Sequence, residues 1–168
     1  HVLVQRDGSI TVTDDGRGIP VGLHPEEKVP VVVLAYTALH AGGKFDKRSG
    51  NSAYAFSGGL HGVGVAVTTA LSLRVDVEVR RDGRIYQVAF TQGGREIGLI
   101  TEVGACGRQT GTRVRVWPDG KYFDSPKVPM NELERLLRSK AVLLPGVRVF
   151  LEVEQADGST TKQEWRYQ

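Results

Sequence analysis

Cysteine is almost absent from this chain: Cys106 is the only one in 168 residues, so no disulfide can form within it. Such usage is typical of proteins from a reducing compartment, and we expect a cytoplasmic location. Neither the cysteine nor the four scattered histidines have the spacing of a zinc site. The sequence has no run of about 18 apolar residues and no signal-peptide pattern, so we expect no association with a membrane.

The chain also lacks a large excess of positive or negative charge. Lys and Arg number 22 against 19 Asp and Glu, a net charge of +3, which is too small to argue for DNA binding by this chain alone. The pattern Gly-Lys-Ser/Thr does not occur, which excludes a P-loop. Linkers, repeats and low-complexity segments are absent as well, and 40% of the residues are hydrophobic. Residues 1–168 are therefore predicted to form a single domain with a sizeable core.

Three Asp-Gly pairs separate segments in which apolar and polar residues alternate, the pattern of β-hairpins. They predict hairpins over residues 1–13, 73–90 and 147–167, and a further strand is expected over residues 111–117. Arginines on these strands are expected on a solvated face of the sheet. They are Arg74, Arg80, Arg81, Arg84, Arg113 and Arg115.

Apolar runs predict helices over residues 30–40 and 63–71. A third helix is expected after a capping box formed by Asn131 and Glu134, ending at Pro145-Gly146. Its apolar stripe would consist of Leu133, Leu136, Leu137, Val142 and Leu143. Since the hairpins are apolar on one side, the helices must cover that side. The predicted fold class is α/β: a two-layer sandwich with a mostly antiparallel, mixed sheet covered on one face by helices.

The segment Asp14-Asp15-Gly16-Arg17-Gly18-Ile19-Pro20 joins a carboxylate to a glycine turn. A carboxylate accepts hydrogen bonds, and the exocyclic amine of adenine donates them, so a buried Asp14 at a strand end would select adenine. Gly16 and Gly18 would let the backbone approach a flat base, and Ile19 with Pro20 would supply an apolar wall. The alternative is a plain Asp-Gly turn without a ligand.

A second glycine-rich segment, Ser57-Gly58-Gly59-Leu60-His61-Gly62-Val63-Gly64, precedes a predicted helix. Bare backbone N–H groups before a helix suit phosphate binding. A polar segment precedes it rather than a buried strand, which disfavours a Rossmann site. The alternative is a flexible junction between a loop and a helix.

Four other side chains remain open between a functional and a structural role. His61 would contact phosphate or fix the glycine segment. Lys44, after Gly42-Gly43, would reach phosphate or be solvated, and Tyr54 would order over a nucleotide or anchor the polar loop at residues 44–57. Thr112 would lie beneath the base beside Asp14, or be an ordinary strand threonine.

These motifs, in this order, resemble the ATPase region of bacterial type II topoisomerases, which has the Bergerat fold shared with Hsp90-type chaperones, MutL-type repair proteins and histidine kinases. The resemblance covers essentially the whole chain and includes Leu39-His40-Ala41-Gly42-Gly43-Lys44-Phe45, Thr110-Gly111-Thr112 and Trp117-Pro118. Residues 123–126, 140–147 and 165–168 are more similar to the branch of topoisomerase IV B subunits than to gyrase B.

The resemblance implies a role for each matching residue. Asp14 would take the adenine amine with the help of water and Thr112, and Arg17, Ile19 and Pro20 would line the base pocket. The segment Gly59, Leu60, His61, Gly62, Val63, Gly64 and Val65 would wrap the phosphates. Lys44 and Tyr54 would belong to a lid, and Arg81 would lie at the pocket mouth, where ATP-competitive inhibitors bind.

The resemblance also implies what the chain lacks. The catalytic glutamate and the magnesium-binding asparagine of the family lie on a helix before the first hairpin, and a transducer domain follows the last one. We therefore expect ATP and Mg²⁺ as cofactors, but no catalytic residue and no metal ligand within residues 1–168. In such enzymes ATP dimerises the N-terminal region, and the partners are DNA and the topoisomerase IV A subunit.

Three other functions stay open from the sequence. They are a gyrase B domain, a non-hydrolysing adenine-nucleotide module used as a switch, and the catalytic domain of a histidine kinase. The lid sequence around residues 47–55 also departs from the usual pattern of the family.

Overall fold

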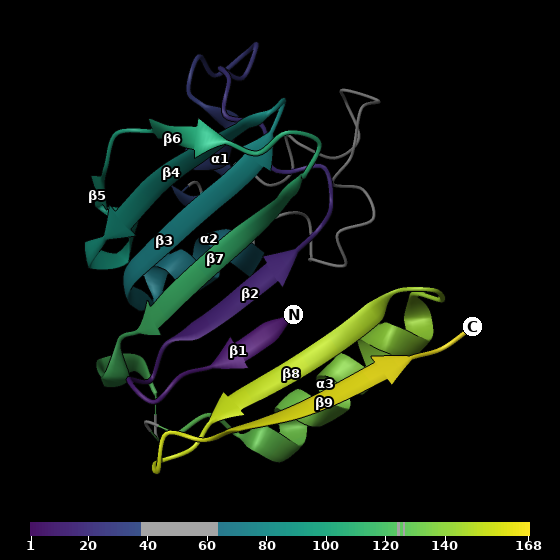
Figure 1. Ribbon diagram of the computed structural model, residues 1–168. Helices are drawn as coiled ribbons and strands as arrows, with labels where there is room; N and C mark the ends of the chain where they lie inside the picture. Colours follow the sequence, from purple (N-terminus) through teal and green to yellow (C-terminus); the bar gives the residue numbers. More distant parts are fainter. Residues whose placement is uncertain (38–63, 124, 126) are drawn as a thin grey trace.

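The structure, a computed structural model, describes residues 1–37, 64–123, 125 and 127–168. These residues form a nine-stranded sheet with helices on one side, as the sequence predicts (Figure 1). The strands are β1 (Val2–Val4), β2 (Ile10–Asp14), β3 (Ser72–Arg81), β4 (Arg84–Thr91), β5 (Glu96–Ile97), β6 (Thr101–Ala105), β7 (Gly111–Pro118), β8 (Arg148–Glu154) and β9 (Thr160–Arg166).

The strand order is β5-β4-β3-β7-β2-β1-β8-β9, and β6 pairs with β4. The three predicted hairpins are confirmed as the antiparallel pairs β1–β2, β3–β4 and β8–β9. The pairing of β1 with β8 is parallel and makes the sheet mixed. Because β7 inserts between β3 and β2, it joins the central hairpin to the first one.

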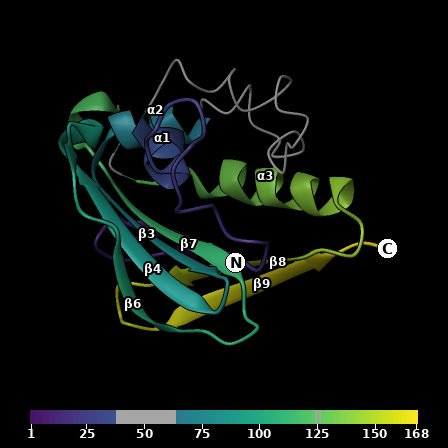
Figure 2. The ribbon, with the colours of Figure 1, turned by 90° about the horizontal axis from the view of Figure 1, so that it is seen from above.

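Helices cover one face of the sheet in two separate places (Figure 2). They are α1 (Val31–Thr37), α2 (Gly64–Ala70) and α3 (Met130–Leu143), with short 3₁₀ turns η2 (Gln92–Gly94) and η3 (Gly120–Tyr122). One core cluster packs α1 against β3 and β4, with Val32 and Tyr36 against Val77 and Phe90. The other packs Leu137 of α3 against Val2, Val4 and Leu151.

The predicted start of α3 is wrong. The helix begins at Met130, and the N–H of Leu133 donates to the carbonyl of Pro129 at 3.0 Å. Asn131 therefore lies inside the first turn and cannot be the N-cap of a capping box with Glu134.

The apolar stripe of α3 is only partly as expected. Leu137 and Ala141 are buried and Leu133 packs beside them, whereas Leu136, Val142 and Leu143 are exposed. A side chain one position from Leu137 is rotated by about 100° around the helix, so Leu136 leaves the face that Leu133, Leu137 and Ala141 share.

Between β4 and β7 the sequence predicts no element, yet β5 and β6 form there. Both are short and exposed, and Leu99 between them is 90% exposed, so no periodic burial marks them. In the described part of the chain, no helix is long and apolar enough to span a membrane.

A polar cluster fastens the first hairpin to the end of β7. Asp7 Oδ2 accepts from Arg115 Nη2 at 2.8 Å and from Trp117 Nε1 at 3.2 Å. The Arg115 guanidinium also lies 4.5 Å from the centroid of the Trp117 ring and donates to the buried Ser9 hydroxyl. The hydrogen bonds from Ser9, foremost, then the hydrogen bond from Trp117 and the positive charge of Arg115, lower the pKa of Asp7 from 3.8 to about 2.

This cluster predicts an acid-sensitive contribution to stability. The pKa of Asp7 is lower in the folded chain, so its stabilisation is complete above pH 3.8 and is lost as the pH falls toward about 2. We expect Asp7→Asn to lower the free energy of unfolding at pH 7 by about 0.5–1 kcal/mol, a small value because the carboxylate is exposed to screening solvent. Urea unfolding between pH 7 and pH 2 measures this, and the difference from wild type should shrink at the acid end.

The matched control is Asp157→Asn in the last hairpin. Asp157 accepts equivalent hydrogen bonds from the N–H and hydroxyl of Ser159, and no arginine or tryptophan partner is among its described contacts. An equal loss of stability in the two variants would show that Arg115 and Trp117 contribute nothing.

Candidate nucleotide site

Asp14 ends β2 directly opposite Thr112 of β7. Its Oδ1 atom accepts from the Gly16 N–H at 2.9 Å and from the Thr112 N–H at 3.3 Å. No bond from a described residue is found at Oδ2. One carboxylate oxygen is thus fixed by the backbone, and the other is left to accept from a ligand.

The loop after Asp14 is held at several points. The Ile19 N–H donates to the Thr112 hydroxyl at 3.3 Å, and Ile19 packs against the core cluster beneath α1. The carbonyl of Pro20 accepts from the N–H of Val32 at 3.0 Å, which ties the loop to the start of α1. Thr112 therefore touches both ends of the loop and lies beside the carboxylate, the position that one of its two possible roles requires.

Two glycines permit this arrangement. Gly18 has φ +82°, and a Cβ there would come within 2.7 Å of the Arg80 carbonyl oxygen. Gly111 has φ +146°, and a Cβ on it would overlap the carbonyl oxygen of Asp14. The close approach of β7 to Asp14 therefore requires a glycine at position 111.

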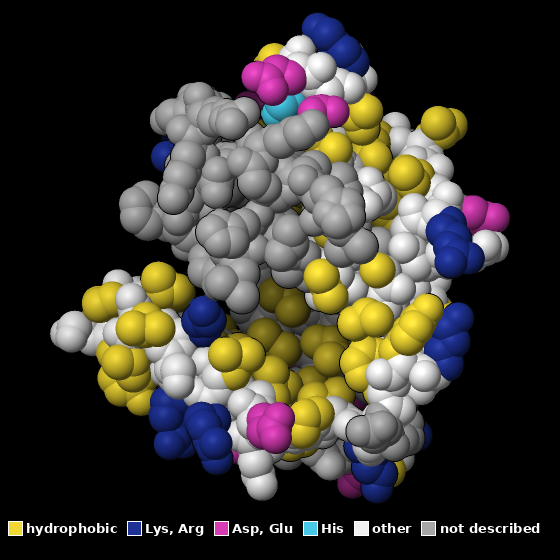
Figure 3. Space-filling view, turned by 180° about the vertical axis from the view of Figure 1, so that it is seen from behind, with side chains coloured by type: hydrophobic (Ala, Val, Ile, Leu, Met, Phe, Trp, Pro, Cys, Tyr) yellow, Lys and Arg dark blue, Asp and Glu magenta, His cyan; other side chains and the backbone are white. Residues whose placement is uncertain are grey.

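Asp14 is exposed, and the expectation that it is buried is wrong for the described residues. It shares the helix-covered face with Val12, since side chains alternate along a strand. The two core clusters cover β3–β4 and β1–β8, and between them Val12 is 44% exposed. Figure 3, which views this side, shows a hollow with hydrophobic side chains at its floor.

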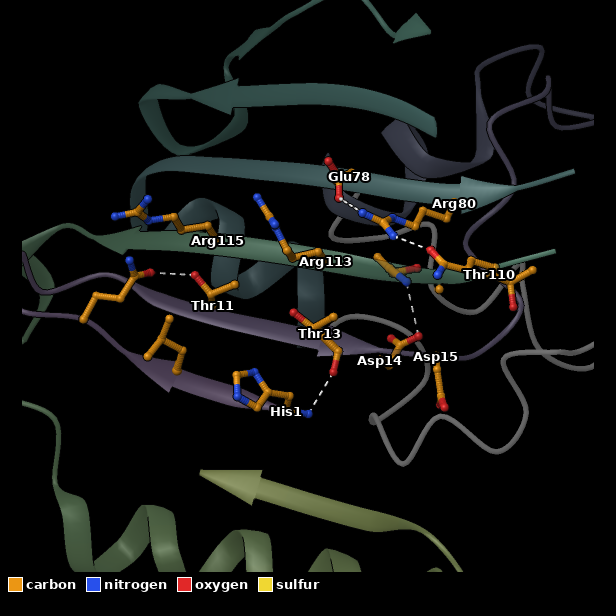
Figure 4. A pocket seen from close by; sticks show the side chains of 15 residues that line it. His1, Thr11, Thr13, Asp14, Asp15, Glu78, Arg80, Thr110, Arg113 and Arg115 are labelled. Carbon is orange, nitrogen blue, oxygen red and sulfur yellow. Dashed lines mark hydrogen bonds and ion pairs between the residues drawn. The ribbon is translucent and has the colours of Figure 1, made fainter. Parts of the chain in front are cut away.

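A cavity of about 760 Å³ opens on the other face of the sheet. Figure 4 shows Arg113 and Arg115 of β7 and Thr11 and Thr13 of β2 lining it. Asp14 lies at its end, but strand alternation directs the Asp14 side chain to the helix-covered face. We therefore do not assign this cavity to the base.

The described part of the chain thus unites Asp14, Gly16, Ile19, Pro20 and Thr112. Arg17 lies in the same loop and is exposed. The predicted helix after the glycine segment is confirmed as α2, which begins at Gly64, and Val65 in its first turn is exposed. The other predicted site residues lie outside the described residues: Gly42, Gly43, Lys44, Tyr54, Gly59, Leu60, His61, Gly62 and Val63.

Two features of the site are not predicted from the sequence. The sequence pattern does not show that Gly111 lies against the backbone of Asp14. Nor does it show that Arg81, expected at a pocket mouth, donates from Nη1 to the carbonyl of Gly18 at 2.8 Å. Both depend on pairing between strands far apart in sequence.

Residues 1–122 match the family model described as histidine kinase-, DNA gyrase B-, and HSP90-like ATPase. The match covers most of the chain, and the two-layer fold agrees with it. The chain belongs to this ATPase family.

Individual relatives within this family have high sequence identity to the chain. The chain is 50% identical over 168 residues to the B subunit of DNA topoisomerase 4 from Escherichia coli, covering 99% of this chain and 25% of that protein. It is 48% identical over 170 residues to the corresponding protein of Pseudomonas aeruginosa, covering 100% and 26%. The B subunit of DNA gyrase from Haloferax volcanii is 43% identical over 163 residues, covering 96% and 25%. The chain spans about a quarter of the length of these relatives.

The geometry at Gly111 predicts a sharp effect of one methyl group. We expect Gly111→Ala to destabilise the chain by about 2 kcal/mol or more, because the Cβ forces β7 away from Asp14 and the backbone is strained. Thermal and urea unfolding measure the loss.

Gly104→Ala is the matched control, since a Cβ at Gly104 meets only Ile85 Cδ1 at an ordinary 3.7 Å. An alanine at 111 as harmless as one at 104 would contradict the close approach.

Proposed function

We propose that this chain is the ATP-binding part of a type II DNA topoisomerase, of the kind found in topoisomerase IV B subunits. The family match supports ATP as the ligand, and identities near 50% along the whole chain support the branch. A gyrase B protein remains the second candidate, at 43% identity. The observation that carries the proposal is the half-engaged carboxylate of Asp14 beside Thr112.

The base would be recognised by Asp14. Gly16 and Thr112 take up Oδ1, so Oδ2 can accept from the exocyclic amine of adenine. Guanine has a carbonyl at the same ring position, and two acceptors would then face each other. Ile19 and Pro20 would border the base, with Arg17 at the exposed side of the loop.

Binding of the phosphates is assigned to the glycine segment Gly59–Val65, with Lys44 and Tyr54 in the lid. This part of the proposal rests on the motifs alone, since most of these residues lie outside the described ones.

Mg²⁺ would accompany ATP and supply charge neutralisation at the phosphates. Among the described residues, no group of three His, Cys, Asp or Glu side chains could hold a metal ion.

In the whole enzyme, ATP binding and hydrolysis would drive dimerisation of the N-terminal region and passage of one DNA segment through another. DNA and the topoisomerase IV A subunit are the proposed partners, the cytoplasm the proposed location, and ATP-competitive inhibitors the proposed ligands near Arg81. The relatives' names, which state one subunit of a DNA topoisomerase, support this reading.

Asp14→Asn tests base recognition. The asparagine oxygen can still accept from Gly16 and Thr112, which turns its NH₂ group toward the adenine amine. We expect an intact fold and a loss of ATP binding of about 1.5–3 kcal/mol, the value of a hydrogen bond to a charged group. Calorimetry with ATP and GTP measures this, and the preference for ATP should shrink with it.

The neighbouring Asp15→Asn removes a carboxylate of the same turn for which no side-chain hydrogen bond is described, and should bind ATP as wild type does. Equal affinity of the Asp14 and Asp15 variants would refute the assignment.

Catalysis gives a second test. A general base must stand within about 3 Å of the attacking water, directly or through one intermediary. Asp14 is assigned to the recognition of adenine instead. The family resemblance places the catalytic glutamate before the first hairpin. We expect a polypeptide limited to residues 1–168 to show no steady-state ATP hydrolysis above background. Turnover that disappears when a carboxylate within the chain is replaced would overturn this expectation.

A further inference from the structure

We propose that Arg81 is a positioning residue that, through the Gly18 carbonyl, holds the base-recognition loop (residues 15–19) in the shape that aims Asp14 at adenine. The inference rests on the proposed function of the site. Arg81 is the last residue of β3, and its Nη1 donates to the Gly18 carbonyl oxygen at 2.8 Å.

Strand alternation brings Arg81 to the correct side of the sheet. Val75, Val77 and Val79 point into the core beneath α1, and Arg81 continues this series on the same face. Its side chain is 32% exposed, and a Cβ on Gly18 would lie 3.1 Å from Val79 Cγ1. The guanidinium thus reaches the loop at the place where the loop already packs against β3.

The carboxylate of Asp82 competes only weakly for this guanidinium. It lies 3.5 Å from Arg81 Nε, not from the Nη1 atom that binds Gly18, and its side chain is 83% exposed. Ion pairs so exposed contribute little. The bond from Nη1 to the carbonyl is shorter and charge-assisted, so it remains the stronger of the two contacts.

The loop needs this bond because its other described hydrogen bonds lie at its ends. At one end Gly16 donates to Asp14, and at the other Ile19 donates to Thr112 at a long 3.3 Å. Gly18, with φ +82°, stands between them, and a glycine without a tether samples many conformations. Movement there would displace the Gly16 N–H and release the carboxylate that it orients.

The test compares two glutamine variants of the same hairpin in the 168-residue chain. Arg81→Gln removes the tether, whereas Arg84→Gln removes an exposed arginine that pairs with Glu102 at 3.5 Å. We expect Arg81→Gln to weaken binding of ATP and of adenosine by the same factor, about 10-fold, or roughly 1.4 kcal/mol. Arg84→Gln should bind as wild type, and Arg81→Lys, which keeps one donor, should recover part of the loss.

A second measurement needs no ligand. In unliganded Arg81→Gln the amide resonances of Gly16 and Gly18 should shift, and in Arg84→Gln they should not, while both variants keep the wild-type melting temperature. If the amide resonances of Gly16 and Gly18 did not shift in Arg81→Gln, the proposal that Arg81 tethers the loop would be refuted.

The two measurements separate this inference from the proposed function. Wild-type affinity in Arg81→Gln would refute the positioning role and leave ATP binding intact. A loss for ATP but not for adenosine would also refute it, because Arg81 would then act on the phosphates directly. If the wild-type chain bound neither ligand, the proposed function would fail, and the amide shifts would still decide whether Arg81 orders the loop.

Discussion

The pairing of Asp14 with Thr112 is the constraint on which the described half of the site depends. It brings the end of the first hairpin against the start of β7, and Gly111 allows the two backbones to meet without a Cβ between them. The same two residues supply a carboxylate with one oxygen fixed and a hydroxyl that receives the Ile19 N–H. Without this register, the loop after Asp14 would lose the contacts with Thr112 that hold it in place.

Register in turn depends on the core and on the far end of the strands. The valines of β3 are buried beneath α1, and a shift of one residue would turn them all to solvent. At the opposite end of β7, Arg115 and Trp117 donate hydrogen bonds to Asp7 in the turn of the first hairpin. The strand that carries Thr112 is therefore fixed on both sides and at both ends.

Much of this fold is predictable from local patterns. Asp-Gly turns between alternating segments indicate the three hairpins, because turn chemistry and side-chain period are properties of a few adjacent residues. The start of α3 was mispredicted because Asn131 and Glu134 have the spacing of a capping box, while Pro129 occupies the N-cap. For the site, the carboxylate and its glycines can be predicted from the sequence. The tether from Arg81 to Gly18 spans 63 positions and appears only in three dimensions.

The most direct measurement of the central claim is a crystal structure of this chain with an ATP analogue that cannot be hydrolysed. The account predicts the adenine amine at about 3 Å from Asp14 Oδ2, a hydrogen-bond distance, with Oδ1 still bound to Gly16 and Thr112. A base bound elsewhere, for instance among Arg113 and Thr13 on the opposite face of the sheet, would contradict it.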